Sequence, residues 1–430
     1  MIKQIWLASL LITGGVPTAT GDTLPDPVTM IIISDPHYIH PSLYDRTSLS
    51  GDIAGRNLKL LAESDELLKT AVQMALRSGA ELVLVPGDLT KDGALASHTG
   101  FADHLAFLEE QGLEVFVVPG NHDINNGQSF AFRGDSTVKV ENVDPQRFGE
   151  IYAPYGYDQA IFRDSSTLSY VAEPLEGLWI IGIDPCLYDL NDPDGPARTD
   201  GKLPRETLLW LERVLETPRA GEVRKIAMMH HSLLEHYRGQ NRFFNEQVVD
   251  NHHRVSRLMA RNGVRVVFTG HCHASDITLK KWNDGSFLYD VETGSLVTYP
   301  CPIRKISLTG DSMRIETWLI WSIPSREDVF QDYAKYNARE ATSAVVGRFL
   351  QNFGFTPCDA VHVASQVGDA FTTHCAGDEV PRHPPLDLRG LPLLNRLMIQ
   401  FRKGLVRSLY QDLTPPDNEI VIDLASGDFR

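Results

Sequence analysis

The sequence predicts an α/β fold, in the form of an α+β layered domain followed by an all-α domain. Short runs rich in Val and Ile alternate with longer segments of helical period from residue 28 to about residue 320. From about residue 326 onward the apolar residues recur mainly at three- and four-residue spacing. A composition of 42% hydrophobic and 22% charged residues over 430 positions is that of a globular protein.

The first part of the chain supplies the strands and helices of the layered domain. Apolar runs predict buried strands at 28–33, 81–85, 115–118, 179–183, 225–229 and 265–268. The segments between them predict amphipathic helices at 63–77, 97–110, 205–215 and 246–262. Three further strands, at 286–292, 303–308 and 313–321, follow without helices. We expect this end of the domain to complete a second sheet.

A change of composition near Ile323 marks the start of the helical part. Ser325, with Asp328 three residues later, offers an N-cap for a helix. Helices are predicted at 326–353, 357–375 and 391–412, separated by proline-containing segments. We therefore place a domain boundary near residue 322, with one domain over 22–322 and a helical domain over 323–430. Residues 420–422 predict an edge strand, after which we expect the chain to fray.

The N-terminus has the layout of a secretory signal peptide. Lys3 precedes a short apolar run over 5–12, and small residues follow at 18–20. We predict a signal peptide over 1–21 and an exported protein, periplasmic or extracellular. The alternatives are a buried first strand and a disordered N-terminus. No apolar stretch approaches the roughly 18 residues that a membrane-spanning helix needs, so no membrane span is predicted.

The charge balance narrows the possible partners. The chain has 56 acidic and 40 basic residues, a formal net charge of −16, and no basic run. Such a surface repels a polyanion, so we expect no long nucleic acid as a partner.

The five cysteines contain no CxxC pair, which excludes a zinc ribbon and a thioredoxin-type motif. Cys358 and Cys375 stand alone together in the helical part, and export would favour their oxidation. We predict a disulfide between them. The bond requires the helix to stop or bend near Gly368, because an unbroken helix would hold its ends too far apart. The alternative is two buried free thiols.

Polar groups typical of metal sites follow five of the predicted strands. In α/β sheets ligands bind beyond the carboxyl ends of the strands, so these groups should converge on one cleft. The five segments are Ser34-Asp35-Pro36-His37, Pro86-Gly87-Asp88, Pro119-Gly120-Asn121-His122-Asp123, His230-His231 and Gly270-His271-Cys272-His273.

These motifs are specific in combination. A D-x-H match alone is expected about once by chance, whereas Gly-Asn-His-Asp is expected roughly 0.003 times. The ligands comprise two Asp, one Asn and four His. This mixed oxygen and nitrogen donor set suits two first-row transition-metal ions rather than Mg²⁺ or Ca²⁺ alone.

With these residues the chain resembles the calcineurin-like metallophosphoesterase family, over roughly residues 28–320. Residues 42–45 and 117–126, the exported N-terminus and the helical C-terminal part resemble bacterial exported members proposed to act on cyclic nucleotides. The resemblance implies a sandwich of two mixed sheets flanked by helices. It also implies Asp35, His37 and His273 on one metal, Asn121, His230 and His271 on the other, Asp88 bridging both, His122 as proton donor and Asp123 orienting its ring.

The chemistry of such a centre supports these expected roles. Two cations about 4 Å apart would bind phosphoryl oxygens and make hydroxide available from a shared water at neutral pH. Asp88 would hold the ions close against their repulsion. Asn121 would add an oxygen ligand without charge. His122, near the metals but not on them, would protonate the leaving group. Its alternative role is to orient a ligand.

We therefore expect a dinuclear metal-dependent phosphoesterase that hydrolyses a small phosphodiester, with a 3′,5′-cyclic nucleotide as the leading substrate. The rivals are a phosphomonoesterase or nucleotidase of the same fold, and a binding or regulatory protein stabilised by its metals. Mn, Fe and Zn all accept the ligand set. The sequence leaves the oligomeric state and the task of the helical domain open. Further candidates for the pocket, which loop polarity explains equally well, are Tyr38, Tyr44, Asn125 and Asn126.

Overall fold

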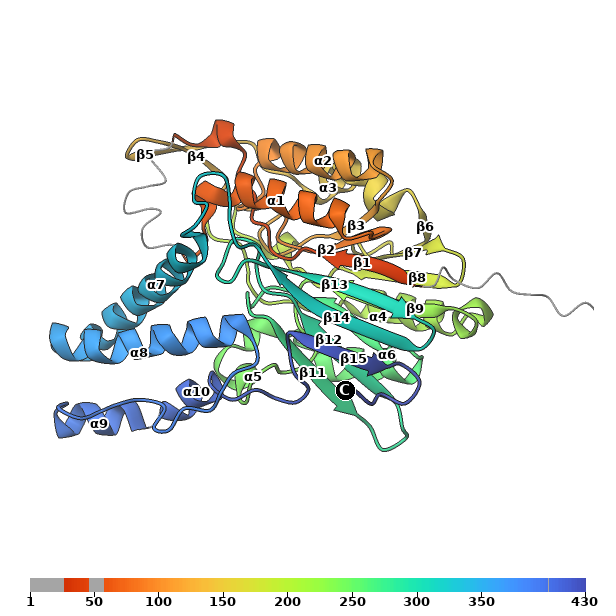
Figure 1. Ribbon diagram of the computed structural model, residues 1–430. Helices are drawn as coiled ribbons and strands as arrows, with labels where there is room; N and C mark the ends of the chain where they lie inside the picture. The colour runs from red at the N-terminus through yellow and green to blue at the C-terminus, as the bar shows by residue number, and fades with distance from the viewer. Residues whose placement is uncertain (1–26, 46–57, 401) are drawn as a thin grey trace, which may run out of the picture.

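Two sheets form the centre of the fold, which we describe from a computed structural model covering residues 27–45, 58–400 and 402–430 (Figure 1). The predicted signal peptide lies outside these residues. The first sheet has the strand order β15-β14-β13-β1-β2-β3, and the second has the order β11-β12-β10-β9-β8-β7-β6. A short hairpin of β4 (Phe130–Arg133) and β5 (Ser136–Lys139) stands apart. The layered α/β fold with two mixed sheets is confirmed.

The strands of the first sheet come from both ends of the chain. They are β1 (Val28–Ile32), β2 (Leu82–Pro86), β3 (Glu114–Val118), β13 (Pro302–Thr309), β14 (Ser312–Leu319) and β15 (Glu419–Asp423). Strands β1, β2 and β3 run parallel. Strand β13 pairs antiparallel with β1, β14 pairs antiparallel with β13, and β15 pairs antiparallel with β14. The carboxyl ends of β1, β2 and β3 therefore lie at one edge of the sheet.

The second sheet contains a parallel centre with antiparallel edges. Its strands are β6 (Ala160–Arg163), β7 (Tyr170–Leu175), β8 (Leu178–Ile183), β9 (Arg224–Met229), β10 (Val266–Thr269), β11 (Asp276–Lys281) and β12 (Phe287–Glu292). Strands β8, β9, β10 and β12 are parallel. At the edges, β11 pairs antiparallel with β12, β7 pairs antiparallel with β8, and β6 pairs antiparallel with β7. The sequence did not predict β6, β7 or β11, which mix polar with apolar residues.

The main apolar core lies between the two sheets. Alternate residues of a strand point to opposite faces, so Ile226 and Met228 of β9 pack in this core together with Leu84 of β2. Ala227 and Met229 face the other side, where they pack under α4 (Arg205–Leu215) and α6 (His252–Arg261). The helices α1 (Ser64–Arg77) and α2 (Leu95–Glu110) lie on the outer side of the first sheet, and the short helix α3 (Pro145–Ile151) lies beside α2 (Figure 1).

The C-terminal helices form an arm that projects from the sheets (Figure 1). They are α7 (Phe330–Asn352), α8 (Pro357–Ala376), α9 (Leu393–Gln400) and α10 (Lys403–Ser408), with α5 (Gln240–Phe243) from the first part of the chain near the base of the arm. The arm has its own apolar cluster, which includes Leu350, Phe355 and Val363. The proposed boundary near residue 322 falls between β14 and α7.

Three expectations for this region are corrected. Cys358 and Cys375 lie at opposite ends of α8, a continuous helix of 20 residues, and both thiols are free. At 1.5 Å per residue their separation along the axis is about 25 Å, far beyond disulfide reach, so the predicted bond is wrong. The tail does not fray, because Val421 and Arg430 exchange two main-chain hydrogen bonds of 2.9 and 3.0 Å. The segment predicted as one helix at 391–412 contains α9 and α10.

The predicted edge strand at 420–422 is confirmed as part of β15, which pairs antiparallel with β14. In the described part of the chain, no helix combines the length and the apolar character needed to cross a membrane.

Candidate dinuclear metal centre

The polar segments predicted from the sequence meet where the two sheets present the ends of their parallel strands. Asp35 and His37 follow β1, Asp88 follows β2, and Asn121 follows β3. His230 follows β9, whereas His271 and His273 follow β10. Main-chain hydrogen bonds join these loops: the N–H of His37 donates to the carbonyl of Asp88 at 2.9 Å, and the N–H of Gly270 donates to the carbonyl of His230 at 3.0 Å.

Five of the seven predicted ligands have a left-handed backbone. Their φ angles are +47° at Asp35, +38° at His37, +50° at Asp88, +75° at His271 and +63° at His273. This region is unfavourable for residues other than glycine, and such residues cluster at functional sites. The surrounding contacts hold this strained backbone in place. The N–H of His271, for example, donates to both carboxylate oxygens of Asp35 at 3.1 Å.

Two glycines allow the loops to come this close. A Cβ on Gly120 would lie 2.1 Å from the main-chain nitrogen of Asp88 and 2.2 Å from its Oδ1. A Cβ on Gly270 would lie 2.3 Å from Oδ2 of Asp35. Glycine is therefore required at both positions for the carboxylates to lie where they do.

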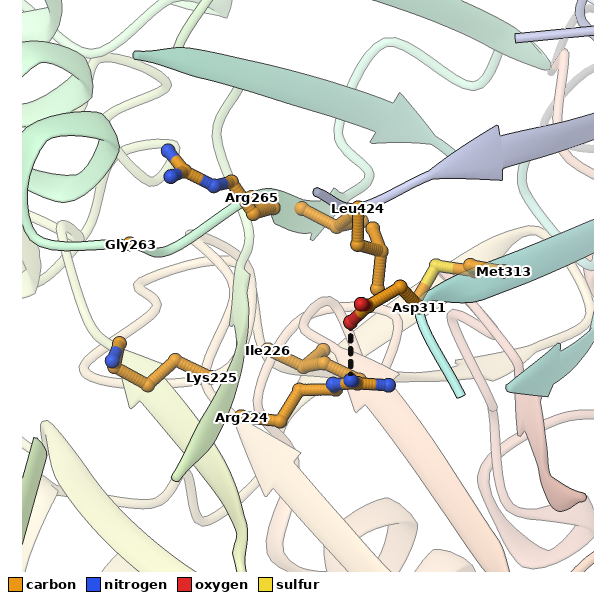
Figure 2. A pocket seen from close by; sticks show the side chains of 9 residues that line it. Arg224, Lys225, Ile226, Gly263, Arg265, Asp311, Met313 and Leu424 are labelled. Carbon is orange, nitrogen blue, oxygen red and sulfur yellow. Dashed lines mark hydrogen bonds and ion pairs between the residues drawn. The ribbon is translucent and has the colours of Figure 1, made fainter. Parts of the chain in front are cut away.

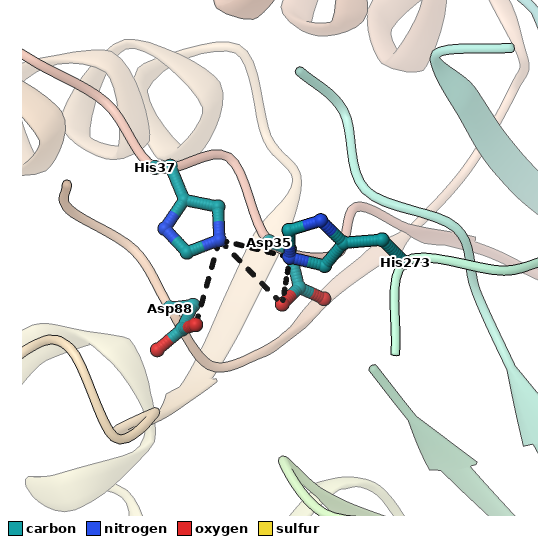
Figure 3. Close-up of side chains that lie close together, drawn as sticks. All are labelled: Asp35, His37, Asp88 and His273. Atoms are coloured by element: carbon teal, nitrogen blue, oxygen red, sulfur yellow. Dashed lines mark hydrogen bonds and ion pairs between the residues drawn. The ribbon is translucent and has the colours of Figure 1, made fainter. Parts of the chain in front are cut away.

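The first group of side chains consists of Asp35, His37, Asp88 and His273 (Figure 3). Nε2 of His37 lies 3.1 Å from Nε2 of His273 and 3.4 Å from Oδ2 of Asp88. Nε2 of His273 lies 3.4 Å from Oδ1 of Asp35. All four side chains are buried. Their ligand atoms lie within 4.8 Å of one another.

The second group shares Asp88 with the first. Asp88 lies within metal-binding reach of His230 and His271, and its Oδ2 is 3.3 Å from Nε2 of His230. The same Nε2 is 3.1 Å from Nδ1 of His271 and 3.2 Å from Oδ1 of Asn121. Asp88 is thus the side chain common to both groups.

The donor chemistry of this cluster fits two cations. Pairs of imidazole nitrogens, and of imidazole nitrogens and carboxylate oxygens, lie only 3.1–3.4 Å apart. Their lone pairs therefore point into the same small space, where a cation can bind them. Oδ1 of Asn121 lies 3.2 Å from Nε2 of His230, so the amide adds an uncharged oxygen to the second group. Mixed imidazole and carboxylate ligands are those of Mn, Fe and Zn.

The electrostatics favour an ionised carboxylate at the centre. Burial opposes the charge on Asp88, but the nearby imidazoles of His230, His122 and His37 outweigh it and hold its pKa well below the usual range. Burial lowers the pKa of His271 well below its usual value, and the neighbouring His231 and His230 lower it further. A neutral imidazole beside a carboxylate is the protonation state that binds a metal.

His122 lies beside the first group and belongs to neither. Its ring centroid is 5.0 Å from that of His37 in an edge-on arrangement, and its side chain is 27% exposed. Its Nδ1 lies 3.0 Å from Oδ1 of Asp92, so the proton on Nδ1 donates to this carboxylate. Burial opposes ionisation of Asp92, but hydrogen bonds from His122 and Lys91 prevail and lower its pKa.

The expected role of Asp123 in orienting the His122 ring is corrected. Its carboxylate points toward the loop after β2, where it accepts main-chain hydrogen bonds from Leu89 at 3.0 Å and Thr90 at 2.9 Å. It also accepts one from Gly120 at 2.8 Å. Burial, followed by the nearby Asp88, raises its pKa to about 6. Asp123 thus fixes the loops, and Asp92 orients His122.

The sequence-based reasoning also missed Lys59. Its Nζ lies 3.3 Å from Nδ1 of His37 and 3.4 Å from Nε2 of His122. Burial lowers its pKa, although Asp88, Asp92 and Asp35 oppose this effect. Neither Lys59 nor Asp92 belongs to a motif, and only the folded chain brings them to the site.

Comparison with known proteins agrees with the architecture. Residues 28–275, more than half of the chain, match the calcineurin-like phosphoesterase family. The chain belongs to this family. It is therefore a metal-dependent phosphoric ester hydrolase, and the family depends on two metal ions.

Two solved structures match part of this phosphoesterase. A dimetal phosphatase from Danio rerio has 17% sequence identity and a TM-score of 0.45, with 68% of this chain and 96% of that chain covered. A purple acid phosphatase from seeds of yellow lupin (Lupinus luteus) has 11% identity and a TM-score of 0.41, with 68% and 52% covered. No curated protein matches the chain.

Other residues that the sequence singled out take different positions in this phosphoesterase. The Nε2 of His231 lies 2.9 Å from the carbonyl of Thr199, and the ring packs against His271. Tyr38 is 2% exposed and belongs to the main core rather than to a pocket. Asn126 donates from Nδ2 to the carbonyl of His122 at 3.0 Å and so supports the loop.

A pocket elsewhere in the phosphoesterase contains none of the predicted ligands (Figure 2). It is lined by Arg224, Lys225 and Arg265, among others, and by the 2.8 Å ion pair between Arg224 and Asp311. Arg224 begins β9, whereas His230 follows its other end. This pocket therefore lies at the opposite end of the strand from the candidate centre.

Proposed function

We propose that this phosphoesterase hydrolyses a small phosphodiester, with a 3′,5′-cyclic nucleotide as the leading substrate. Asp35, His37 and His273 would hold one metal ion, Asn121, His230 and His271 would hold the other, and Asp88 would hold both. Two such ions, when bound, supply Lewis-acid activation of the phosphoryl group and of water. The observation that carries the proposal is that His122 lies next to the first group of ligands, belongs to neither group, and has its ring fixed by Asp92.

His122 would supply the proton that the leaving group needs. When water replaces the ester oxygen on phosphorus, the released alkoxide of a sugar is a strong base and needs a proton. The Nδ1 proton of His122 is committed to Asp92, so the proton given to the leaving oxygen is the one that Nε2 carries in the imidazolium form, and the ring is left as the neutral Nδ1–H tautomer. A fixed tautomer and ring orientation is the arrangement that proton transfer requires.

Lys59 would help to bind the anionic substrate. Its Nζ lies between His37 and His122, on the side of the site where the proton donor stands. A half-buried ammonium group at this place can pair with a phosphoryl oxygen, and a charge-assisted contact of this kind is stronger than a neutral hydrogen bond. Lys59 would thus position the phosphate for protonation of its leaving group.

The preference for a cyclic nucleotide rests on the sequence resemblance in residues 42–45 and 117–126. The rival within the same fold is a phosphomonoesterase or nucleotidase. Both reactions release an alkoxide, so the leaving-group chemistry alone does not choose between them.

A panel of substrates tests the proposal. Purified protein is loaded in turn with Mn²⁺, Fe²⁺ and Zn²⁺, and kcat/KM is measured for 3′,5′-cyclic AMP, 5′-AMP, bis-p-nitrophenyl phosphate and p-nitrophenyl phosphate. We expect the two diesters to be cleaved faster than the matching monoesters. The Asp88→Asn protein, purified in parallel, controls for contaminating phosphatases. Faster turnover of both monoesters at every metal loading would instead identify a phosphomonoesterase.

We also propose that the protein is exported, on the basis of the signal-peptide layout over 1–21. Expression of the full chain followed by N-terminal sequencing of the mature protein tests this. Cleavage near residue 21 with recovery outside the cytoplasm is expected, and a cytoplasmic protein that keeps Met1 or begins at Ile2 would contradict it.

A further inference from the structure

A second cluster of metal-ligating side chains lies where the helical arm meets the second sheet. Asp276 begins β11, His374 lies in the last turn of α8, and Glu379 follows that helix. Their candidate ligand atoms lie within 4.8 Å of one another. The three side chains are only 1%, 5% and 6% exposed, respectively. This cluster shares no residue with the candidate dinuclear centre.

The hydrogen bonding of the cluster is incomplete. Oε1 of Glu379 lies 2.5 Å from Nδ1 of His374, but Oε2 is enclosed and has no hydrogen-bond partner within the described residues. Oδ1 of the nearby Asp412 is in the same state. An enclosed carboxylate oxygen without a donor is costly, because a buried charge needs a partner or a bound cation.

The surroundings of the cluster add negative charge, which the buried His236 and Arg304 offset only in part. Asp378, Asp412 and Asp417 form an adjoining acidic group. Burial and the neighbouring Glu379 and Asp276 raise the pKa of Asp412 to about 7. The buried cation nearby, Arg304, donates to the carbonyls of Asp417 and Glu292 and to Thr317 rather than to a carboxylate.

A hydrogen bond with His236 orients the carboxylate of Asp276. Nδ1 of His236 lies 2.8 Å from Oδ1 of Asp276. Partners of this kind orient ligating carboxylates in metal sites. The ring of His374 is held edge-on by Tyr237, with 5.2 Å between the ring centroids.

We propose that Asp276, His374 and Glu379 bind a third divalent metal ion of the Zn²⁺ type, separate from the two ions of the candidate dinuclear centre. One imidazole and two carboxylates are a donor set that Zn²⁺ accepts. Binding of the ion would release the proton that Nδ1 of His374 and Oε1 of Glu379 share. The proposal does not rest on the proposed substrate or reaction.

Because the site lies between the arm and the second sheet, the ion would have a structural role. His374 and Glu379 belong to the arm, whereas Asp276 belongs to the second sheet. The main chains already meet here, since the N–H of Ser275 donates to the carbonyl of Cys375 at 3.2 Å. An ion bound by all three side chains fastens the end of α8 to the strand that directly follows the His271–His273 loop.

Metal content of the full-length protein tests the proposal. The protein is stripped with EDTA, reloaded with Zn²⁺, desalted and analysed for zinc per chain. We expect three ions in the wild type and two in Glu379→Gln and in His374→Gln. Glu379→Gln keeps the size of the side chain and an acceptor for His374, and circular dichroism checks that both variants fold. Asp369→Asn, on α8 like His374, removes an ion pair with Arg339 of α7 and should keep three ions.

Anomalous diffraction at the zinc edge locates the ions. A peak between Asp276, His374 and Glu379 is expected, and its loss in Glu379→Gln would support the assignment. Peaks confined to the candidate dinuclear centre, or equal zinc content in the wild type and both variants, would overturn the proposal. A peak here with none at the dinuclear centre would contradict the proposed function while supporting this site.

Discussion

The carboxylate of Asp92 accepts a hydrogen bond of 3.0 Å from Nδ1 of His122. The two residues are 30 positions apart, and the contact fixes both the tautomer and the orientation of the imidazole ring. The same ring meets His37 edge-on. This relationship separates His122 from the candidate metal ligands and leads to the first prediction.

The His122→Ala variant should keep both metal ions and lose activity according to the leaving group. General acid catalysis contributes about 10²- to 10⁴-fold, so hydrolysis of an ester with an alkoxide leaving group should fall within that range. Hydrolysis of a nitrophenyl ester should fall much less, because nitrophenolate leaves without a proton. Kinetics on both esters, with metal analysis, check this. Equal losses at full metal occupancy would exclude the role of proton donor.

Asp88→Asn should abolish activity and lower the metal content. Asp88 is common to both groups of ligands, and the neutral amide offers one oxygen where the carboxylate offers two. Asn121→Ala should mainly deplete the ion of the second group, since Oδ1 of Asn121 lies 3.2 Å from Nε2 of His230 in that group. Elemental analysis of the purified variants decides between these outcomes. Full occupancy of both ions in Asp88→Asn would contradict the shared role of this carboxylate.

Lys59→Met should lower kcat/KM by roughly 10- to 100-fold, the effect of losing one hydrogen bond to a charged group. Met has a similar length and no charge, so packing is largely kept. Steady-state kinetics should show most of the loss in KM if Lys59 binds the phosphate. The matched control is Lys69→Met on α1, whose side chain is 61% exposed and pairs with Asp65. Unchanged kinetics in Lys59→Met would remove Lys59 from the site.

Gly120→Ala should disrupt the centre without touching a predicted ligand. The added Cβ would lie 2.1 Å from the main-chain nitrogen of Asp88, and a backbone contact of this kind cannot relax easily. We expect loss of metal and of activity. Gly404→Ala in α10, where the added Cβ meets nothing within 4 Å, is the control. Retention of both ions and full activity in Gly120→Ala would show that the loops do not need this close approach.

The raised pKa of Asp184 leads to a prediction for how the stability of the fold depends on pH. Burial raises its pKa from 3.8 to about 6, although Cys186, Tyr188 and Leu168 donate hydrogen bonds to its carboxylate. The folded protein therefore binds this proton more tightly than the unfolded chain. The stabilisation is complete below about pH 4 and is lost as the pH rises through 6.

The Asp184→Asn variant lacks this titration. Relative to the variant, the free energy of unfolding of the wild type should fall by about 3 kcal/mol between pH 4 and pH 7. Urea unfolding of the metal-free proteins at several pH values measures the difference. Asp135→Asn, at an exposed position in the β4–β5 turn, should show no such trend. A constant difference between wild type and Asp184→Asn across this range would disprove the raised pKa.

The sequence predicted the central strands well because their apolar runs are continuous. Strands β1, β2, β8 and β9 are buried on both faces, so they show as runs of Val, Ile, Leu and Met. Strand β6 alternates between half-buried and exposed residues, and the hairpin strand β5 is fully exposed. Neither has the apolar pattern from which a strand is predicted.

The same limit applies to the candidate site. Motifs at the ends of strands predicted which seven side chains would meet, because topology brings those ends to one edge. The partner of His122 was not predictable in this way. Asp123 is adjacent in sequence, but its carboxylate turns toward the main chain of Leu89 and Thr90, and the more distant Asp92 fills the place. Lys59 likewise reaches the site only through the packing of the folded chain.

The spacing of the seven side chains along the chain also sets when metal can be acquired. Asp35 and His271 are 236 residues apart, and no short segment carries more than two members of the set. An incomplete or unfolded chain therefore presents only isolated pairs, which bind ions weakly. We expect ions to enter after folding is complete. A chain that crossed a membrane unfolded would then take its metals from the compartment in which it folds, and the supply there would decide which element the enzyme uses.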